Sequence, residues 1–119
     1  MTNYKRGDVV LVLFPNSDLS TFKKRPALVV QADDLDTGLP QVIVSLITTN
    51  LMRSGHKSRV TVDAASDEGV SAGLRSDSVI VTDNLATVKN PFIEKVIGAI
   101  ADMTDVDNAI ANTFGLRLA

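Results

Sequence analysis

Residues 23–30 constrain the fold of this 119-residue chain more than any other segment. Three cations stand directly before a proline, and an unbroken apolar run rich in β-branched residues follows. The run is too short for an independent helix, so it predicts a buried strand over residues 25–31. Pro26 fixes its own φ and restricts the preceding residue to an extended conformation. We therefore expect Arg25 to be held rigidly where its guanidinium can bind a phosphate or a carboxylate.

Length and composition favour one domain spanning residues 1–119, large enough to bury a core. Cysteine is absent, which excludes disulfides, a thiolate nucleophile and a cysteine-based zinc site. We expect a soluble, cytoplasmic protein with no membrane association, because no apolar run approaches the ~20 residues that span a bilayer.

The net charge of −2 argues against a protein that coats nucleic acid non-specifically, because such binding scales with the number of phosphates neutralised. The charges are unevenly distributed. Residues 1–62 hold eight Lys and Arg against five Asp, whereas residues 63–119 hold four against nine acidic residues. A basic face on a mildly acidic body is therefore compatible with the sequence.

Several apolar segments separated by turn formers predict a mainly β protein. We expect strands over residues 8–14, 25–31, 41–49, 58–62, 77–83 with a continuation at 86–88, and 94–100, although the last could also form a helical turn. Residues 15–24 predict a long polar loop, 32–40 a short helical turn or loop, 50–57 an exposed basic connection, and 67–74 a turn. This order predicts a small, strongly twisted barrel or half-barrel with a terminal helix packed across it.

The terminal helix is predicted from Thr104, which we expect to cap it, to a stop at Gly115. Apolar residues recur at helical spacing from Val106 to Phe114. We expect Phe14 and Phe114 to lie in the core.

The sequence resembles the MazF/PemK toxins of bacterial type II toxin–antitoxin systems. The residues that carry the resemblance are 6–10, Pro15, 24–30, Ile47 with Thr48, 73–80, Asp83 and 86–88, in matching order and spacing. The resemblance implies an α+β, SH3-like twisted β-barrel of five to seven strands with a C-terminal helix and short helical turns. It also implies a homodimer that acts as an mRNA interferase, a metal-independent endoribonuclease that cleaves single-stranded mRNA at specific sequences. The implied partners are single-stranded RNA and a cognate antitoxin that lays a flexible segment over the RNA groove, with no cofactor and no metal.

The resemblance implies that Arg25 and Thr48 are the essential catalytic pair, and it aligns Asp83 with an acid implicated in some members. Metal-free cleavage by the 2′-hydroxyl passes through a doubly charged phosphorane, which the Arg25 fork can stabilise. The Thr48 hydroxyl can donate to a phosphate oxygen, although a one-residue register error would put Thr49 in its place. Asp83 either accepts the 2′-hydroxyl proton or, more in keeping with a carboxylate beside an arginine, orients Arg25.

Two departures from the family pattern leave the proton transfers open. Some members have an Arg at the position of Val81, and some have a His at the position of Leu19. Any mechanism that uses those groups requires a substitute such as Lys24, Arg53 or His56. His56 is the only histidine of the chain and is either an acid–base group or a solvated loop residue.

RNA binding is predicted for basic, hydroxyl and aromatic side chains in the loops. These are Lys23, Lys24, Ser20, Phe22, Arg53, His56 and Lys57, with Arg59 in the second basic cluster and Asp8 and Ser78 as possible supporting residues. Phe22 is the best candidate to stack on a base. The alternative function is a catalytically silent SH3-like module that binds nucleic acid or a peptide in the same groove.

Overall fold

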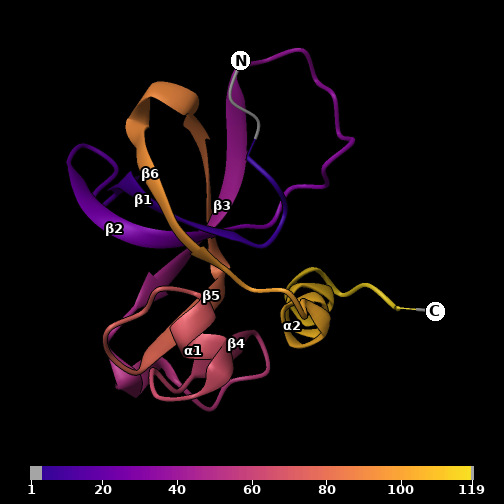
Figure 1. Cartoon of the computed structure of the whole chain (residues 1–119). Coiled ribbons are helices and arrows are strands. Elements are labelled where there is room, and N and C mark those ends of the chain that lie inside the picture. The colour runs from indigo at the N-terminus through magenta and orange to yellow at the C-terminus, as the bar shows by residue number, and fades with distance from the viewer. Residues whose placement is uncertain (1–3, 119) are drawn as a thin grey trace.

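The structure is a computed structural model that describes residues 4–118. Six strands and a C-terminal helix dominate it, with short helical turns between them (Figure 1). The strands are β1 (Asp8–Pro15), β2 (Phe22–Val29), β3 (Gln41–Thr48), β4 (Arg59–Val62), β5 (Ser78–Lys89) and β6 (Ile93–Ala99). The helices are α1 (Asp67–Ser71) and α2 (Thr104–Phe114), and the 3₁₀ turns are η1 (Leu51–Arg53) and η2 (Asn90–Phe92).

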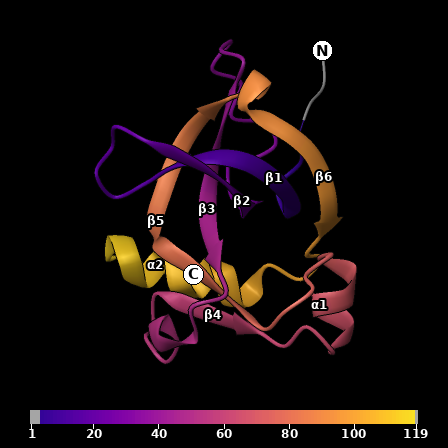
Figure 2. The ribbon, with the colours of Figure 1, turned by 90° about the vertical axis from the view of Figure 1, so that its left-hand side faces the viewer.

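All the strands form one antiparallel sheet in the order β4-β5-β3-β2-β1-β6. Its strong twist carries β1 and β2 across β3 and β5 (Figure 2). The two outer strands, β4 and β6, are not paired with each other within residues 4–118, so the sheet is open. The predicted mainly β class, with its C-terminal helix and short helical turns, is confirmed.

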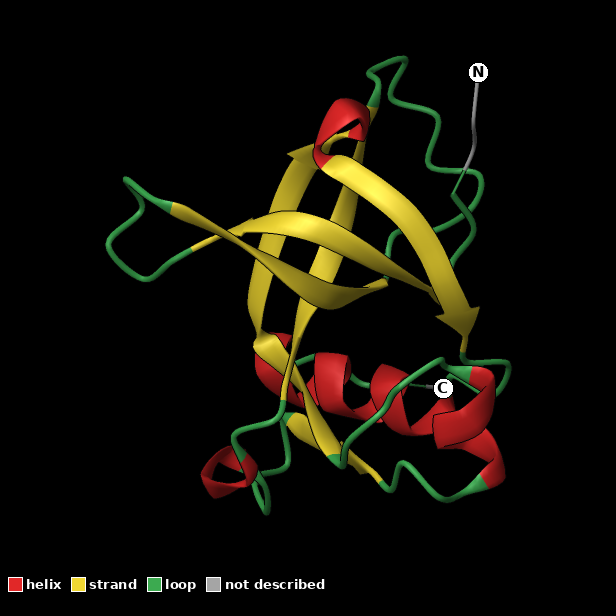
Figure 3. Cartoon of the chain, turned by 60° about the vertical axis from the view of Figure 1, so that its left-hand side comes forward, coloured by secondary structure: helices red, strands yellow, loops and turns green. Residues whose placement is uncertain are grey.

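The sheet is buried on both faces, which explains the unbroken apolar runs in the sequence. One face forms an inner core that includes Val12, Phe14 and Val81. The opposite face forms an outer core in which Leu28 and Ile47 pack with α2, which lies across one end of the sheet (Figure 3). Because successive side chains of a strand point to opposite faces, each run supplies both cores. The expected burial of Phe14 is confirmed.

Strand β5 is one continuous strand of 12 residues, with an irregularity in its pairing to β3. Ser45 pairs with Leu85 and the next residue, Leu46, pairs with Val81. The Ser45 hydroxyl donates to the Val81 carbonyl at 2.8 Å, so a side chain fills a place that the backbone ladder leaves open. The three residues 82–84 are therefore unpaired with β3, and Asp83 among them is exposed.

Strand β2 begins three residues earlier than predicted. Phe22 already pairs with Pro15, so the two cations that precede Arg25 belong to the strand, and the connecting loop is confined to residues 16–21. The sequence pattern failed here because the side chains of these three residues are exposed, and an exposed hairpin arm has no apolar signal.

Two details of the predicted terminal helix were wrong, and one was confirmed. Thr104 is the first helical residue, and its backbone N–H is bound by the Asp102 carboxylate at 3.0 Å, so Thr104 is not the cap. Phe114 is 58% exposed in the last turn, because its side chain points away from the sheet, although the preceding Thr113 still bonds to Thr82 of β5 at 3.0 Å. Gly115 ends the helix as predicted, with a left-handed φ of 69°.

The predicted turn at residues 67–74 contains the one-turn helix α1. The Ser66 hydroxyl caps this helix by accepting from the Gly69 N–H at 3.0 Å. A Cβ at Gly69 would collide with the backbone at Asp63 and Ala64, so the glycine that suggested a turn instead permits close packing of a helix.

Replacement of Gly73 by alanine is expected to destabilise the fold for two reasons. Its φ is +74°, and an added methyl group would collide with the backbone carbonyl of Ile97. We expect Gly73→Ala to lower the free energy of unfolding by about 2–4 kcal/mol in urea denaturation. Gly38→Ala is the matched control, because Gly38 has nearly the same φ (+76°) and open space around it, and it should cost only about 1 kcal/mol. Equal losses in both variants would contradict the predicted clash.

Candidate functional site

The register between β2 and β3 places Arg25 and Thr48 on the same face of the sheet. Ala27 pairs with Leu46, and the side chains of both lie in the inner core. The pairing between β2 and β3 ends at this pair; Arg25 lies two residues beyond it on β2, and Thr48 lies two residues beyond it on β3. Side chains two residues apart on a strand share a face, so the register directs both polar side chains to the margin of the inner core.

The Arg25 guanidinium has a neutral partner and no carboxylate partner among residues 4–118. Arg25 stands opposite Val12 on β1 and is partly buried. Its Nη2 donates to Oδ1 of Asn16 at 3.3 Å. The ion pairs found in residues 4–118 are Arg6–Asp107, Lys24–Glu94 and Arg59–Asp83. The positive charge of Arg25 is therefore uncompensated by any of them, which suits a group that binds an anion.

Thr48 ends β3 with its hydroxyl oxygen already in use as an acceptor. The backbone N–H of Asn50 donates to Thr48 Oγ1 at 3.1 Å. This contact fixes the rotamer of a β-branched side chain and leaves the hydroxyl hydrogen free for another acceptor. Thr49, the alternative assignment, is exposed and lies in the bend that follows β3.

Asp83 is bound by Arg59, which corrects the expectation that it orients Arg25. Arg59 Nε and Nη2 donate to the two Asp83 carboxylate oxygens at 3.3 and 3.0 Å, and Arg59 Nη1 donates to the Arg53 carbonyl at 3.2 Å. These hydrogen bonds from Arg59 hold the pKa of Asp83 below its usual value. The same pairing raises the pKa of Arg59. A carboxylate held ionised by an arginine is a weak base.

Arg59 lies directly opposite Val81, the position at which some family members have an arginine. The two residues pair across β4 and β5. Val81 itself is fully buried in the inner core. Sequence reasoning placed Arg59 only in a basic cluster, because its pairing with Asp83 spans 24 residues and depends on strand register.

The strand alternation separates the predicted RNA-binding residues of β2. Lys23 lies two residues before Arg25 and shares its face. Lys24 points to the other face, where its Nζ pairs with Glu94 Oε1 at 3.0 Å. Phe22 also points away from Arg25 and packs edge-on against Phe92, with ring centroids 6.0 Å apart. The structure therefore brings Lys23 to the side of Arg25 and does not bring Phe22 or Lys24.

The predicted basic connection after β3 is exposed and carries Arg53, His56 and Lys57. The Nδ1 atom of His56 accepts from the Ser58 backbone N–H at 3.0 Å, which places the proton of the neutral ring on Nε2. A surface hollow contains Lys57 and Arg59 but neither Arg25 nor Thr48. It is lined by Lys57, Arg59, Val60 and Thr61, with Asp105, Asn108, Ala109 and Asn112 from α2.

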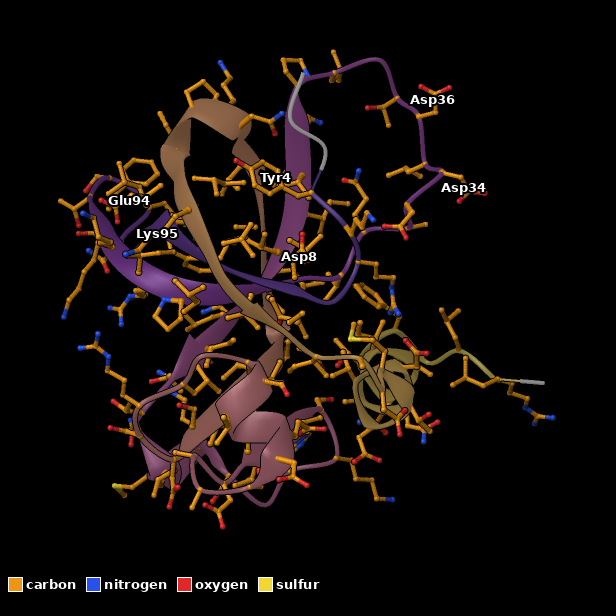
Figure 4. The ribbon with its side chains drawn as sticks, in the orientation of Figure 1. Tyr4, Asp8, Asp34, Asp36, Glu94 and Lys95 are labelled. Carbon is orange, nitrogen blue, oxygen red and sulfur yellow. The ribbon has the colours of Figure 1, made fainter. Side chains whose placement is uncertain are left out.

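Three other predicted residues have local structural contacts. The Asp8 carboxylate accepts from the Lys5 backbone N–H at 2.9 Å at the start of β1, set apart from Glu94 and Lys95 in Figure 4. Ser78 is buried, and its hydroxyl donates to the Ser76 carbonyl at 2.8 Å. Ser20 is exposed in the β1–β2 loop and donates its backbone N–H to Asp18. None of these contacts joins Asp8 or Ser78 to Arg25 or Thr48.

The described residues offer neither a metal-binding cluster nor a membrane-spanning helix. Residues 4–118 contain no group of three or more His, Cys, Asp or Glu side chains placed to hold a metal ion. No helix in this part of the chain is both long and apolar enough to cross a membrane.

Comparison with known proteins assigns the chain to one family. The family model described as PemK-like, MazF-like toxin of type II toxin-antitoxin system matches residues 5–114. The Mycobacterium tuberculosis toxin MazF-mt6 is similar in structure, with a TM-score of 0.73 and 26% identity over 93% of this chain and 99% of that one.

Two further solved structures share the fold at lower identity. One is an endoribonuclease from a mycobacterial species in complex with its cognate antitoxin, with a TM-score of 0.74 and 20% identity over 98% of this chain and 99% of that one. The other is a MazE–MazF structure from Deinococcus radiodurans, with a TM-score of 0.70 and 19% identity over 98% and 100%. Because the family model covers nearly the entire chain, this protein belongs to the PemK-like, MazF-like toxins of type II toxin–antitoxin systems.

Proposed function

We propose that this toxin is an endoribonuclease that cleaves single-stranded mRNA without a metal. Arg25 and Thr48 are its catalytic residues. The observation that carries the proposal is the β2–β3 register, which directs an arginine without a carboxylate partner and a threonine hydroxyl to one face. Two of the similar structures are described as endoribonucleases, which supports the same activity.

In the proposed reaction the RNA 2′-hydroxyl gives up its proton to solvent as its oxygen attacks the adjacent phosphorus, and the 5′-oxygen of the next nucleotide leaves in line and takes up a proton from solvent. Arg25 binds the non-bridging oxygens and stabilises the charge that develops on the phosphorane. The Thr48 hydroxyl donates a further hydrogen bond to one of these oxygens. The upstream fragment keeps a 2′,3′-cyclic phosphate, and the downstream fragment begins with a 5′-hydroxyl.

Asp83 supports this site by holding Arg59 and does not act as the base. Its two oxygens already accept hydrogen bonds from Arg59, and its pKa is lowered by them. Lys23 and the basic connection of Arg53, His56 and Lys57 would guide the RNA backbone on either side of Arg25. Binding of this kind depends on phosphate neutralisation and should weaken with salt.

The proposed partners follow from the relatives. The structures of a mycobacterial endoribonuclease with its cognate antitoxin and of MazE–MazF support a cognate antitoxin for this chain. We include a homodimer in the proposal, with the antitoxin laying a flexible segment over the RNA face.

Incubation of the purified protein with mixed RNA in EDTA tests activity and metal independence together. We expect discrete fragments whose mapped upstream ends carry a 2′,3′-cyclic phosphate. RNA binding without any cleavage product would instead indicate the silent binding module.

Arg25→Ala should reduce the cleavage rate by on the order of a thousandfold, because it removes the group that stabilises the developing charge. Lys89→Ala removes one exposed positive charge at the end of β5, opposite Gln41 and so at the other end of β3 from Thr48, and it should leave the rate within about twofold of the wild type, since distant exposed charges are screened. Single-turnover kinetics on one mapped RNA site measure both. An Arg25→Ala protein that cuts as fast as the wild type would refute the catalytic assignment.

Thr48→Val removes the hydroxyl but keeps the shape of the side chain. We expect a loss in kcat of about 10- to 100-fold, in line with removal of one donor to a developing oxyanion. Thr49→Val is the matched control in the exposed bend after β3 and should change kcat by less than about twofold. A larger loss in Thr49→Val than in Thr48→Val would show that the functional hydroxyl is Thr49.

Asp83→Asn should lower the melting temperature at neutral pH, and its difference from the wild type should disappear at acid pH. The pKa of Asp83 is lowered in the folded state, so its ionised form stabilises the fold above the unfolded value of about 3.9. That contribution is lost as the pH falls through the folded pKa. The melting temperatures of variant and wild type should therefore start to converge below about pH 4 and coincide only below the lowered folded pKa of Asp83.

The same variant separates the two roles of Asp83 in catalysis. If Asp83 only holds Arg59, Asp83→Asn should lower kcat by about tenfold or less. If Asp83 is the general base, the same substitution should lower kcat by at least about a hundredfold. Cleavage measured at pH 7 decides between them.

A further inference from the structure

The β1–β2 loop next to Arg25 is closed by its own hydrogen bonds. The Asn16 N–H donates to the Thr21 carbonyl at 2.9 Å, and the Leu19 N–H donates to the Asn16 carbonyl at 2.9 Å. The Asp18 carboxylate accepts from the backbone N–H groups of Ser20 and Thr21 at 3.0 and 3.1 Å. Although this loop projects from the body of the sheet in Figure 3, its ends are tied together across six residues.

The side chains of this loop form a chain of hydrogen bonds with one possible direction. Thr21 Oγ1 donates to the Asp18 carboxylate, whose oxygens lie at 3.0 and 3.1 Å and only accept. The Thr21 oxygen then accepts from Asn16 Nδ2 at 2.9 Å. The remaining amide atom, Asn16 Oδ1, faces Arg25 Nη2 at 3.3 Å, and a guanidinium only donates. Each partner thus fixes the direction of the next, from Asp18 to Arg25.

The charge of Asp18 anchors this direction. The Ser20 and Thr21 backbone N–H groups, together with the Thr21 hydroxyl, hold the pKa of the Asp18 carboxyl below its usual value. The carboxylate therefore stays ionised at neutral pH and accepts from Thr21 rather than donating to it. Thr21 cannot reverse while Asp18 is charged.

The group that contacts Arg25 at the end of this series of hydrogen bonds is the neutral side-chain amide of Asn16. The two arginines of residues 4–118 that do form ion pairs, Arg6 and Arg59, are each held by a carboxylate, unlike Arg25. A carboxylate at the position of Asn16 would hold the guanidinium more strongly but would oppose its binding to a phosphate. An amide oxygen orients the guanidinium and leaves its full charge available.

We propose that Asn16 is a positioning residue that orients the Arg25 guanidinium without compensating its charge, with Thr21 and Asp18 setting the direction of the Asn16 amide. The effect on cleavage rests on the proposed function, whereas the contact between Asn16 and Arg25 does not. Sequence reasoning missed Asn16 because the Pro-Asn-Ser-Asp run is also typical of an ordinary turn. Asn16 lies nine residues before Arg25 in the sequence, and only the pairing of β1 with β2 brings the two side chains together.

Kinetics of three loop variants test the proposal on a mapped RNA site. Asn16→Ala should lower kcat by about tenfold with KM changed by less than about twofold, because it loosens an oriented catalytic group. Asn16→Asp should lower kcat further, by on the order of a hundredfold, because its carboxylate competes with the phosphate for Arg25. Ser17→Ala is the control, since it removes an exposed hydroxyl of the same loop, and it should behave like the wild type.

The Asn16→Asp result separates orientation from mere loop stability. A purely structural role would be preserved or strengthened by the charged partner, so an Asp variant at least as active as the Ala variant would overturn the proposal. Thr21→Ser keeps the hydroxyl and should retain near wild-type kcat, whereas Thr21→Val should match Asn16→Ala. Equal losses in Thr21→Ser and Thr21→Val would also overturn it. Melting temperatures of all variants identify any that fail to fold.

A spectroscopic measurement decides the contact independently of activity. The side-chain Nε–H signal of Arg25 in ¹⁵N-labelled protein is assigned by its loss in Arg25→Ala. We expect this signal to shift in Asn16→Ala and Thr21→Val and to stay in place in Ser17→Ala. An unchanged signal in Asn16→Ala refutes the contact. If the signal shifts as expected but the wild type cleaves no RNA, the proposed function fails while the positioning of Arg25 by Asn16 is supported.

Discussion

The pairing register between β2 and β3 is the constraint on which the arrangement of Arg25 and Thr48 depends. A shift of one residue would turn every side chain of one strand to the other face. It would also move the apolar side chains of the strand from one core to the other. Because both faces of the sheet are buried, the packing of Leu28 and Ile47 against α2 resists the same slip that would separate Arg25 from Thr48. The two cores thus stabilise the geometry of the polar pair.

The distribution of charge partners distinguishes Arg25 from Arg6 and Arg59. Arg59 is fixed by a bidentate contact with Asp83, and Arg6 is paired with Asp107 on α2. Arg25 instead meets an amide oxygen. A partly buried cation without a carboxylate is less stable than a paired one, and this cost is consistent with a group reserved for an anionic ligand. The neutral loop contact offsets part of that cost without neutralising the charge.

Much of the fold was predictable because the β-branched runs and their turn formers are local signals. The six strands, the terminal helix and its stop at Gly115 follow from such patterns. The errors occur where a local signal was absent or had a competitor. The β2 arm at Phe22 is exposed and gave no apolar signal, and Asp102 replaced Thr104 at the helix start. The expected burial of Phe114 failed because helical spacing does not show which residue at the edge of the apolar stripe reaches the sheet.

The sequence by itself determined the strand-forming runs, the rigid presentation of Arg25 before Pro26 and the family to which the residue pattern belongs. These properties depend on neighbouring residues and on their spacing along the chain. Only the tertiary structure decided the partners of the polar side chains: Arg59 for Asp83, Glu94 for Lys24 and Asn16 for Arg25. Such pairs join different strands or the two arms of a hairpin, so they are set by register and twist, which no local pattern specifies.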